Sequence, residues 1–170
     1  STGNNPYDTV NDYYQPPAPP RNPHHKIGLD VGGVLTISHK LTSDNLQPVP
    51  FAISAVNYLI NLYGADNIFI ISKAGHDMSV KIERWIGQNL PRFSKSNLRF
   101  CRDRTGPDGK VPIFRRCKLT HFIDDHDEVL QAIYTDKESK HHINKPDGKL
   151  IQFKINGYSQ TIPRTHHRPL

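Results

Sequence analysis

Two spacings of apolar residues alternate along the chain, and their alternation predicts the fold. Short apolar runs suit buried strands, and they lie at 27–31, 67–72, 98–101 and 121–124. Longer stretches space their apolar residues along one face of a helix, at 52–63, 78–90, 111–118 and 127–134. Strands that alternate with helices form a parallel sheet covered by helices on both faces. We therefore predict an α/β fold with three layers, a Rossmann-like parallel sheet between helices.

Cap and turn residues indicate where some of these elements end. Asp77 is a suitable N-cap for the second helix, and Pro91 ends that helix. Towards the C-terminus, the Asn156-Gly157 pair separates 150–155 from 158–162. Asn-Gly is a preferred two-residue hairpin turn. We therefore predict a β-hairpin near the end of the chain.

The first 25 residues differ from the rest in composition. They hold six prolines among Asn, Tyr and Gln, with too few apolar side chains to form a core. We expect residues 1–25 to be a flexible proline-rich arm and residues 26–170 to form the α/β domain. Within the arm, the stretch from Pro16 to Arg21 fits a polyproline ligand for a proline-recognising partner, although proline-rich leaders often have no such role.

A single aspartate follows the first strand in the segment KIGLDVGGVLTIS, residues 26–38. Asp30 ends the apolar run, and Gly32 and Gly33 follow it, where the backbone can approach a ligand closely. This arrangement suits a pocket for a phosphate group. The alternative is a plain glycine turn in which Asp30 serves only as a cap.

Polar residues also follow the later strands, and ligands of open parallel sheets bind at these strand ends. The residues are Ser72, Lys110, Asp124 and Asp125. With Asp30 they supply what phosphoryl transfer to a carboxylate needs: a nucleophile, groups that hold phosphate and acidic ligands for magnesium. Each can also be structural, because Ser72 and the acidic pair can cap turns or helices and Lys110 can be a solvated helix start.

In these motifs the chain resembles the haloacid dehalogenase-like (HAD) superfamily of aspartate-nucleophile hydrolases, over roughly residues 26–134. LDVGGVL resembles the first motif, IFIIS the second, Lys110 the third-motif lysine and HFIDD the fourth motif. The resemblance implies an α/β fold of that family and a phosphatase that works through an aspartyl-phosphate intermediate. The roles it implies are Asp30 as nucleophile; Ser72, Lys110 and Gly33 as phosphate-binding residues; and Asp30, the Gly32 carbonyl, Asp124 and Asp125 as ligands of Mg²⁺.

One position departs from the family pattern. Most phosphatases of this family carry a second aspartate two residues after the nucleophile, as general acid and base, and here that position is Gly32. A positioned general acid contributes typically about 10²–10⁴-fold. His76, His126 and Lys73 are candidate substitutes. The rival hypothesis is a weakly active or inactive relative that binds nucleic acid or protein.

The spacing of the motifs leaves no room for a separate cap domain before or after Ser72. Capless members of the superfamily tend to act on large substrates. The segment from Arg92 to Lys118 contains nine Lys or Arg residues and only two Asp, whereas the whole chain has a net charge of +6. This segment would suit a nucleic acid that carries the phosphate ester, but a charged run can equally be a solvated face.

Composition narrows the cellular setting. Two cysteines are too few for a disulfide framework, which favours a reducing compartment. Every apolar stretch is far shorter than the roughly 20 residues of a membrane-spanning helix, so we expect no membrane association. These two features predict an intracellular protein of the cytoplasm or nucleus. That it acts on a phosphorylated substrate is what the family resemblance implies.

Overall fold

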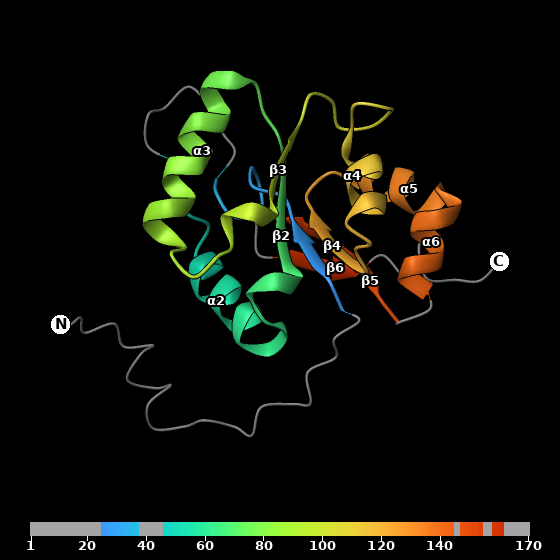
Figure 1. Ribbon diagram of the computed structural model, residues 1–170, viewed down its shortest axis with the longest axis horizontal. Helices are drawn as coiled ribbons and strands as arrows, with labels where there is room; N and C mark the ends of the chain where they lie inside the picture. The colour runs from blue at the N-terminus through green and yellow to red at the C-terminus, as the bar shows by residue number, and fades with distance from the viewer. Residues whose placement is uncertain (1–24, 38–45, 145–146, 155–157, 162–170) are drawn as a thin grey trace.

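The computed structural model describes residues 25–37, 46–144, 147–154 and 158–161, and it contains one six-stranded sheet (Figure 1). The strand order is β3-β2-β1-β4-β5-β6, and the first five of these strands run parallel. The strands are β1 (Ile27–Leu29), β2 (Ile68–Lys73), β3 (Leu98–Cys101), β4 (His121–Asp124), β5 (Lys149–Lys154) and β6 (Tyr158–Thr161). The predicted parallel sheet is therefore confirmed.

Helices cover both faces of the sheet. In Figure 1, α2 and α3 lie on one side of the strands, and α4, α5 and α6 lie on the other. The helices are α2 (Ala52–Tyr63), α3 (His76–Asn89), α4 (Lys110–Arg116), α5 (Asp127–Thr135) and α6 (Lys137–Asn144), with short 3₁₀ turns η1 (Ala65–Asn67) and η2 (Lys95–Asn97). This arrangement confirms the Rossmann-like α/β prediction.

The side chains of β2 show how the layers are held together. Ile68 and Ile70 pack with α2 and α3 in one apolar cluster, whereas Phe69 and Ile71 pack with α4, α5 and α6 in a second cluster. Successive strand residues point to opposite faces, so a strand between two helical layers is apolar on both. The continuous run IFII in β2 follows from this position.

The C-terminal hairpin is present and extends the sheet. β5 pairs in parallel with β4, and β6 returns antiparallel to β5, with Ile151 opposite Thr161. The predicted Asn156-Gly157 turn lies outside the described residues. The parallel pairing of β5 places its carboxyl end beside that of β4, next to the polar strand ends.

Two helices differ from the prediction. α3 begins at His76 with Gly75 as N-cap, so the predicted Asp77 cap is wrong and Asp77 lies in the first turn. α6 was not predicted, because only Ser139 and Ile143 of its eight residues are buried. Its start is fixed instead by Asp136, whose Oδ2 accepts hydrogen bonds from the backbone N and Oγ of Ser139 at 3.0 and 2.8 Å.

Residues 1–24 of the predicted proline-rich arm, with its stretch from Pro16 to Arg21, lie outside the described part of the chain, whereas the last residue of the arm, His25, is described. Within the described part, every helix is too short or too polar to cross a membrane. Cys101 and Cys117 are both free thiols. Cys101 is buried, as expected for a small core residue, whereas Cys117 is half-buried.

Candidate active site

The two central strands bring two aspartates to the same edge of the sheet. β1 and β4 are adjacent and parallel, and Asp30 follows β1 while Asp124 ends β4. The backbone N of Asp30 donates a hydrogen bond to the carbonyl O of Ile123 at 2.9 Å, which continues the pairing past the end of β1. The strand order reverses between these strands, and ligands of open α/β sheets bind at such a point.

Lys110, the first residue of α4, lies between the two carboxylates. Its Nζ is 2.8 Å from Oδ1 of Asp30 and 2.8 Å from Oδ2 of Asp124, and all three side chains are buried. Burial tends to lower the pKa of the Lys110 ammonium, but the two carboxylates outweigh it and raise the pKa above its ordinary value. The ammonium therefore stays charged and holds the two strand ends together.

The carboxyl groups differ in how readily they ionise. Burial raises the pKa of Asp30 to about 8, against the lowering effect of the Lys110 charge. Burial acts on Asp124 in the same direction, but hydrogen bonds from His126 and the charge of Lys110 outweigh it and hold its pKa below the ordinary value. One ammonium is thus not enough to keep both buried carboxyl groups ionised, so ionisation of Asp30 favours a further positive group.

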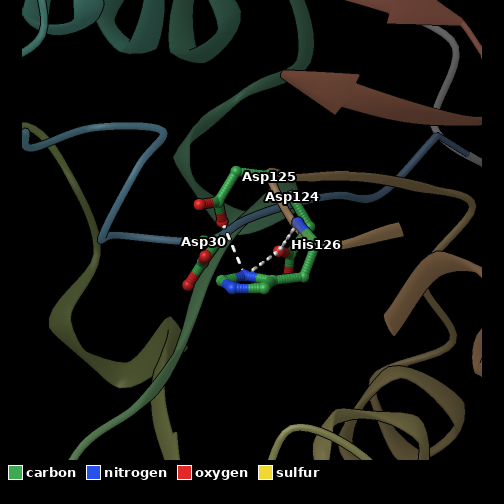
Figure 2. A group of neighbouring side chains, drawn as sticks. All are labelled: Asp30, Asp124, Asp125 and His126. Atoms are coloured by element: carbon green, nitrogen blue, oxygen red, sulfur yellow. Dashed lines mark hydrogen bonds and ion pairs between the residues drawn. The ribbon is translucent and has the colours of Figure 1, made fainter. Parts of the chain in front are cut away.

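Asp125 and His126 complete the acidic cluster (Figure 2). Nδ1 of His126 lies 2.9 Å from Oδ1 of Asp125, and the His126 backbone N donates to Oδ1 of Asp124 at 2.9 Å. The imidazole of His126 also interacts with Asp124, since its Nδ1 lies 3.5 Å from Oδ1 of Asp124, and this side-chain hydrogen bond raises the pKa of the imidazole. Gln152 of β5 supports the turn, because its Nε2 donates to the carbonyl O of Asp125 at 3.3 Å.

Gly33 lies directly against Asp125. A Cβ at Gly33 would be 2.2 Å from Oδ2 of Asp125, and the backbone φ of +83° is one that residues with side chains rarely adopt. Gly33, which the sequence predicts to bind phosphate, therefore leaves space for the carboxylate of Asp125. Gly32 lines the cleft that Asp30 also lines.

We expect Gly33→Ala to weaken Mg²⁺ binding by about 10–100-fold, because the added methyl group displaces Asp125. Gly106→Ala is the matched control, since Gly106 has φ +82° but open space around its Cβ. Both variants should lose roughly 1–2 kcal/mol of unfolding free energy from backbone strain. Only Gly33→Ala should also lose metal affinity, measured by calorimetry. Equal metal affinity in the two variants would contradict the role of Asp125 as a metal ligand.

The acidic cluster has the chemistry of a divalent cation site. One potential ligand atom each from Asp30, Asp124, Asp125 and His126 lies within 4.8 Å of the others. Opposite oxygen ligands of Mg²⁺ are roughly 4.2 Å apart, and those of Ca²⁺ roughly 5 Å. Three carboxylates are typical of hard cations, whereas imidazole favours transition metals. The carboxylates therefore fit the class of cation to which Mg²⁺ belongs.

Binding of Mg²⁺ is expected to release a proton at about pH 7, because metal ligands must be deprotonated. In the metal-free protein the raised pKa keeps Asp30 protonated below about pH 8. The affinity for Mg²⁺ should thus increase as the pH rises towards about 8 and level off above it. Calorimetric titrations in buffers of different ionisation enthalpy measure the released proton. Affinity that stays constant across this range would show that Asp30 is already ionised or is not a ligand.

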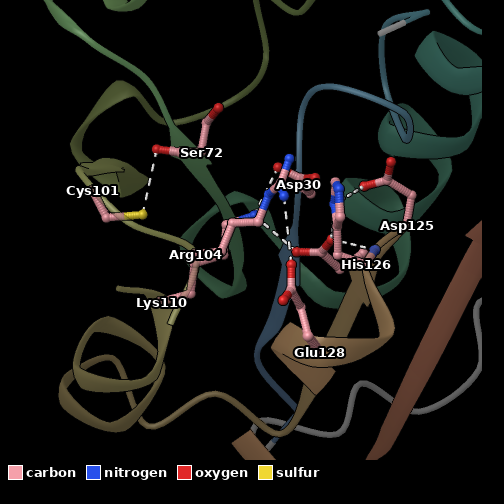
Figure 3. A network of polar contacts seen from close by, with 9 residues as sticks. Asp30, Ser72, Cys101, Arg104, Lys110, Asp125, His126 and Glu128 are labelled. Carbon is pink, nitrogen blue, oxygen red and sulfur yellow. Dashed lines mark hydrogen bonds and ion pairs between the residues drawn. The ribbon is translucent and has the colours of Figure 1, made fainter. Parts of the chain in front are cut away.

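A cleft of about 680 Å³ opens above these residues and reaches β2 and β3. Ser72 lies in its wall with 3% of its surface exposed, and its carbonyl O accepts a weak hydrogen bond from Sγ of Cys101 (Figure 3). Lys73 also lines the cleft. Of the three candidate proton donors, Lys73 and His126 line it, whereas His76 is exposed at the start of α3 and is not among its lining residues.

The sequence did not single out three further residues of this cleft. Thr36 is fully buried in the loop after β1, and its Oγ1 has no hydrogen-bond partner among the described residues. Arg102 and Arg104 come from the loop after β3. The sequence includes both arginines in a basic run, but nothing in the run distinguishes them from its other cations.

No protein-family model matches the chain, and no curated protein matches its sequence. The geometry of the cleft therefore provides the evidence for function. Its components are a metal-compatible set of carboxylates, a buried ammonium and a serine, all at the carboxyl ends of parallel strands.

Proposed function

We propose that the protein is a magnesium-dependent phosphohydrolase of the haloacid dehalogenase-like type, with Asp30 as its nucleophile. The supporting observation is the convergence of Asp30 and Asp124 on one buried ammonium, that of Lys110, with Asp125 in the same cluster. In the alternative of a plain glycine turn, Asp30 would need neither the buried partner nor the second carboxylate.

In this proposal Asp30 attacks the phosphorus of a phosphate monoester in line with the leaving group. A bond forms between Oδ of Asp30 and phosphorus, and the bond from phosphorus to the ester oxygen breaks. The Ser72 hydroxyl and the Lys110 ammonium hold phosphoryl oxygens. Mg²⁺, when bound by Asp30, the Gly32 carbonyl, Asp124 and Asp125, supplies positive charge against the phosphoryl group. Water then hydrolyses the aspartyl phosphate and releases inorganic phosphate.

The leaving-group oxygen needs a proton that Gly32 cannot provide. His126 and Lys73 line the cleft, so they are the candidate donors by position. Side chains that have not been matched to this task give slow turnover of poor leaving groups. We therefore propose that the protein turns over alkyl phosphates slowly and aryl phosphates faster.

We also propose that the site has no cap domain. Among the described residues, only α2 and η1 lie between β1 and β2, and only α3, η2 and β3 lie between β2 and α4. These elements belong to the central domain, since α2 and α3 pack in its apolar cluster. An open cleft of this kind admits a substrate much larger than the phosphate group itself.

A phosphate mimic tests the proposed function. Beryllium trifluoride forms a stable analogue of an aspartyl phosphate, so it should bind when Mg²⁺ is present and raise the melting temperature. The same addition to Asp30→Asn should have no effect, because the amide cannot form the adduct. A parent protein that fails to bind the fluoride with Mg²⁺ would rule out phosphoryl transfer to Asp30.

The rival proposal is a weakly active or inactive relative that serves as a binding module for nucleic acid or protein. Gly32 is the observation that favours it, because the usual acid and base is missing. A pure binding module shows no turnover in the parent protein, while its binding of nucleic acid is unaffected by Asp30→Asn. Phosphate release that depends on Asp30 would exclude it.

A further inference from the structure

Charge in the cleft is divided between the two halves of the sheet. The acidic cluster lies at the ends of β1 and β4. Lys73 ends β2, and Arg102 and Arg104 follow β3, so the ends of the other two strands carry these three cations. Lys110 lies within the acidic cluster instead, and the Arg104 side chain reaches Glu128 of α5. Neighbouring strands are about 4.8 Å apart, which places β3 roughly 10 Å from β1. That distance is wider than one phosphate group.

The two arginines are carried by a loop with a defined shape. One carbonyl group fixes the start of this loop, because the backbone N atoms of Arg102 and Asp103 both donate to the carbonyl O of Asp108, at 3.2 and 3.1 Å. A Cβ at Gly109 would lie 2.6 Å from the carbonyl C of Thr105, so the middle of the loop packs closely against its last residue. Such a loop presents its guanidinium groups with little loss of backbone entropy on binding.

Lys110 ties this loop to the acidic cluster. Its backbone N donates to the carbonyl O of Arg104 at 3.3 Å, while its Nζ contacts Asp30 and Asp124. The backbone of Arg104 is therefore linked through Lys110 to the carboxylates, whereas its side chain pairs with Glu128 (Figure 3). Any ligand held by the loop is thus held at a set distance from Asp30.

Acidic groups near Arg102 and Arg104 only partly offset the charge of these arginines. Asp103 lines the cleft between the arginines, and Nη1 of Arg104 lies 3.5 Å from Oε1 of Glu128. Both side chains of that pair are about half exposed, with 46% and 59% of their surface accessible, so the pair is weak and exchangeable. A phosphate is a stronger partner, because guanidinium groups bind its oxygens in a bidentate manner.

Apart from Arg102, Arg104 and Lys110, the cations of the basic segment 92–118 do not line the cleft. Arg92 donates to Oδ1 of Asn61, Arg99 donates to the carbonyl O of Ser96, and Arg115 pairs with Asp136 and Glu138. Among the lining residues of the cleft, the segment contributes only Arg102, Asp103, Arg104 and Lys110. The charge that faces the cleft is therefore local rather than a property of the whole run.

We propose that Lys73, Arg102 and Arg104 form a wall that binds a second phosphate of the substrate, distinct from the one that Asp30 attacks. This inference rests on the proposed function and specifies its substrate class: phosphate monoesters whose alcohol portion carries a further phosphate. A nucleoside bisphosphate and the phosphorylated end of an oligonucleotide share this chemistry. The open cleft admits either one.

The test is a set of binding titrations on the full chain with Mg²⁺, in which no turnover is needed. The probes are adenosine 5′-monophosphate, adenosine 3′,5′-bisphosphate and a 5′-phosphorylated trinucleotide. We expect the parent protein to bind at least one of the last two about tenfold or more tightly than the monophosphate. The double variant Arg102→Ala, Arg104→Ala should lose that preference. The matched control Arg116→Ala, Lys137→Ala removes two exposed cations outside the cleft and should keep it.

The outcomes separate this inference from the proposed function. A parent protein without preference for a second phosphate overturns the inference, as does an equal loss of preference in the control. A double variant that loses monophosphate affinity as strongly overturns it too, because the arginines would then hold the scissile phosphate. If the preference is present but beryllium trifluoride does not bind, the wall is supported and the proposed chemistry fails. The tighter of the two probes identifies the source of the second phosphate.

Discussion

Asp30→Asn is expected to reduce the proposed phosphate release by about 10⁴-fold or more, because the amide cannot act as the proposed nucleophile. The change keeps the shape of the side chain and removes only its charge and nucleophilicity. Burial already raises the pKa of Asp30 to about 8, so a neutral group at this position should not destabilise the metal-free protein. Phosphate release from an aryl phosphate in the presence of Mg²⁺ measures the effect.

Asp66→Asn is the control for this experiment. This variant makes the same chemical change at an exposed residue of η1. Because η1 directly precedes β2, Asp66 lies at the opposite end of β2 from the cleft. It should retain full activity. Residual turnover in Asp30→Asn close to that of Asp66→Asn would show that the nucleophile is another group, or that a contaminating phosphatase is measured.

Gly32→Asp is expected to increase the turnover of alkyl phosphates by about 10²–10⁴-fold, because it places a carboxyl group where the proposed mechanism lacks a general acid. Gly32 is not among the glycines with positive φ, so its backbone can accept a side chain. Aryl phosphates should change little, since a phenolate leaves without being protonated. The ratio of kcat for an alkyl and an aryl ester in each protein is the measurement.

Gly32→Asn separates acid catalysis from a steric effect. The amide has nearly the same size as the carboxyl group but cannot donate an acidic proton. Gly32→Asn should therefore have the same ratio of alkyl to aryl turnover as the parent protein. An equal increase in both variants, or an equal increase for both esters, would mean that the side chain acts by filling space rather than by protonating the leaving group.

Elements with strong local signals were predicted to within a residue or two. β3 and β4 have the predicted bounds, because their apolar runs end in polar residues on both sides. α6 was missed because its burial depends on contact with α4 and α5 rather than on an apolar stripe of its own. The start of α3 was misplaced, since Gly75 caps the helix through its backbone conformation and Asp77 contributes only charge.

The candidate site was predictable as far as strand ends could indicate it. Parallel strands carry their carboxyl ends to one edge, so the grouping of Asp30 with Asp124 followed from the order of strands and helices. The contacts between the residues of this group could not be predicted from that order. The close approach of Gly33 to Asp125, and the support that Gln152 gives to the turn, join residues about 90 and 27 positions apart along the chain.

The amino-acid pattern over short stretches of the chain was enough to determine the alternation of strands and helices. That alternation also determined the edge of the sheet at which the polar residues gather. Periodicity and turn residues act over a few positions, and a printed sequence displays them directly. Only the folded chain determined that Lys110 is buried between two carboxylates while Arg102 and Arg104 face the cleft. Burial and charge pairing depend on which distant segments pack together. The sequence around a lysine or arginine in a basic run therefore does not indicate whether that residue is buried, faces the cleft or is exposed.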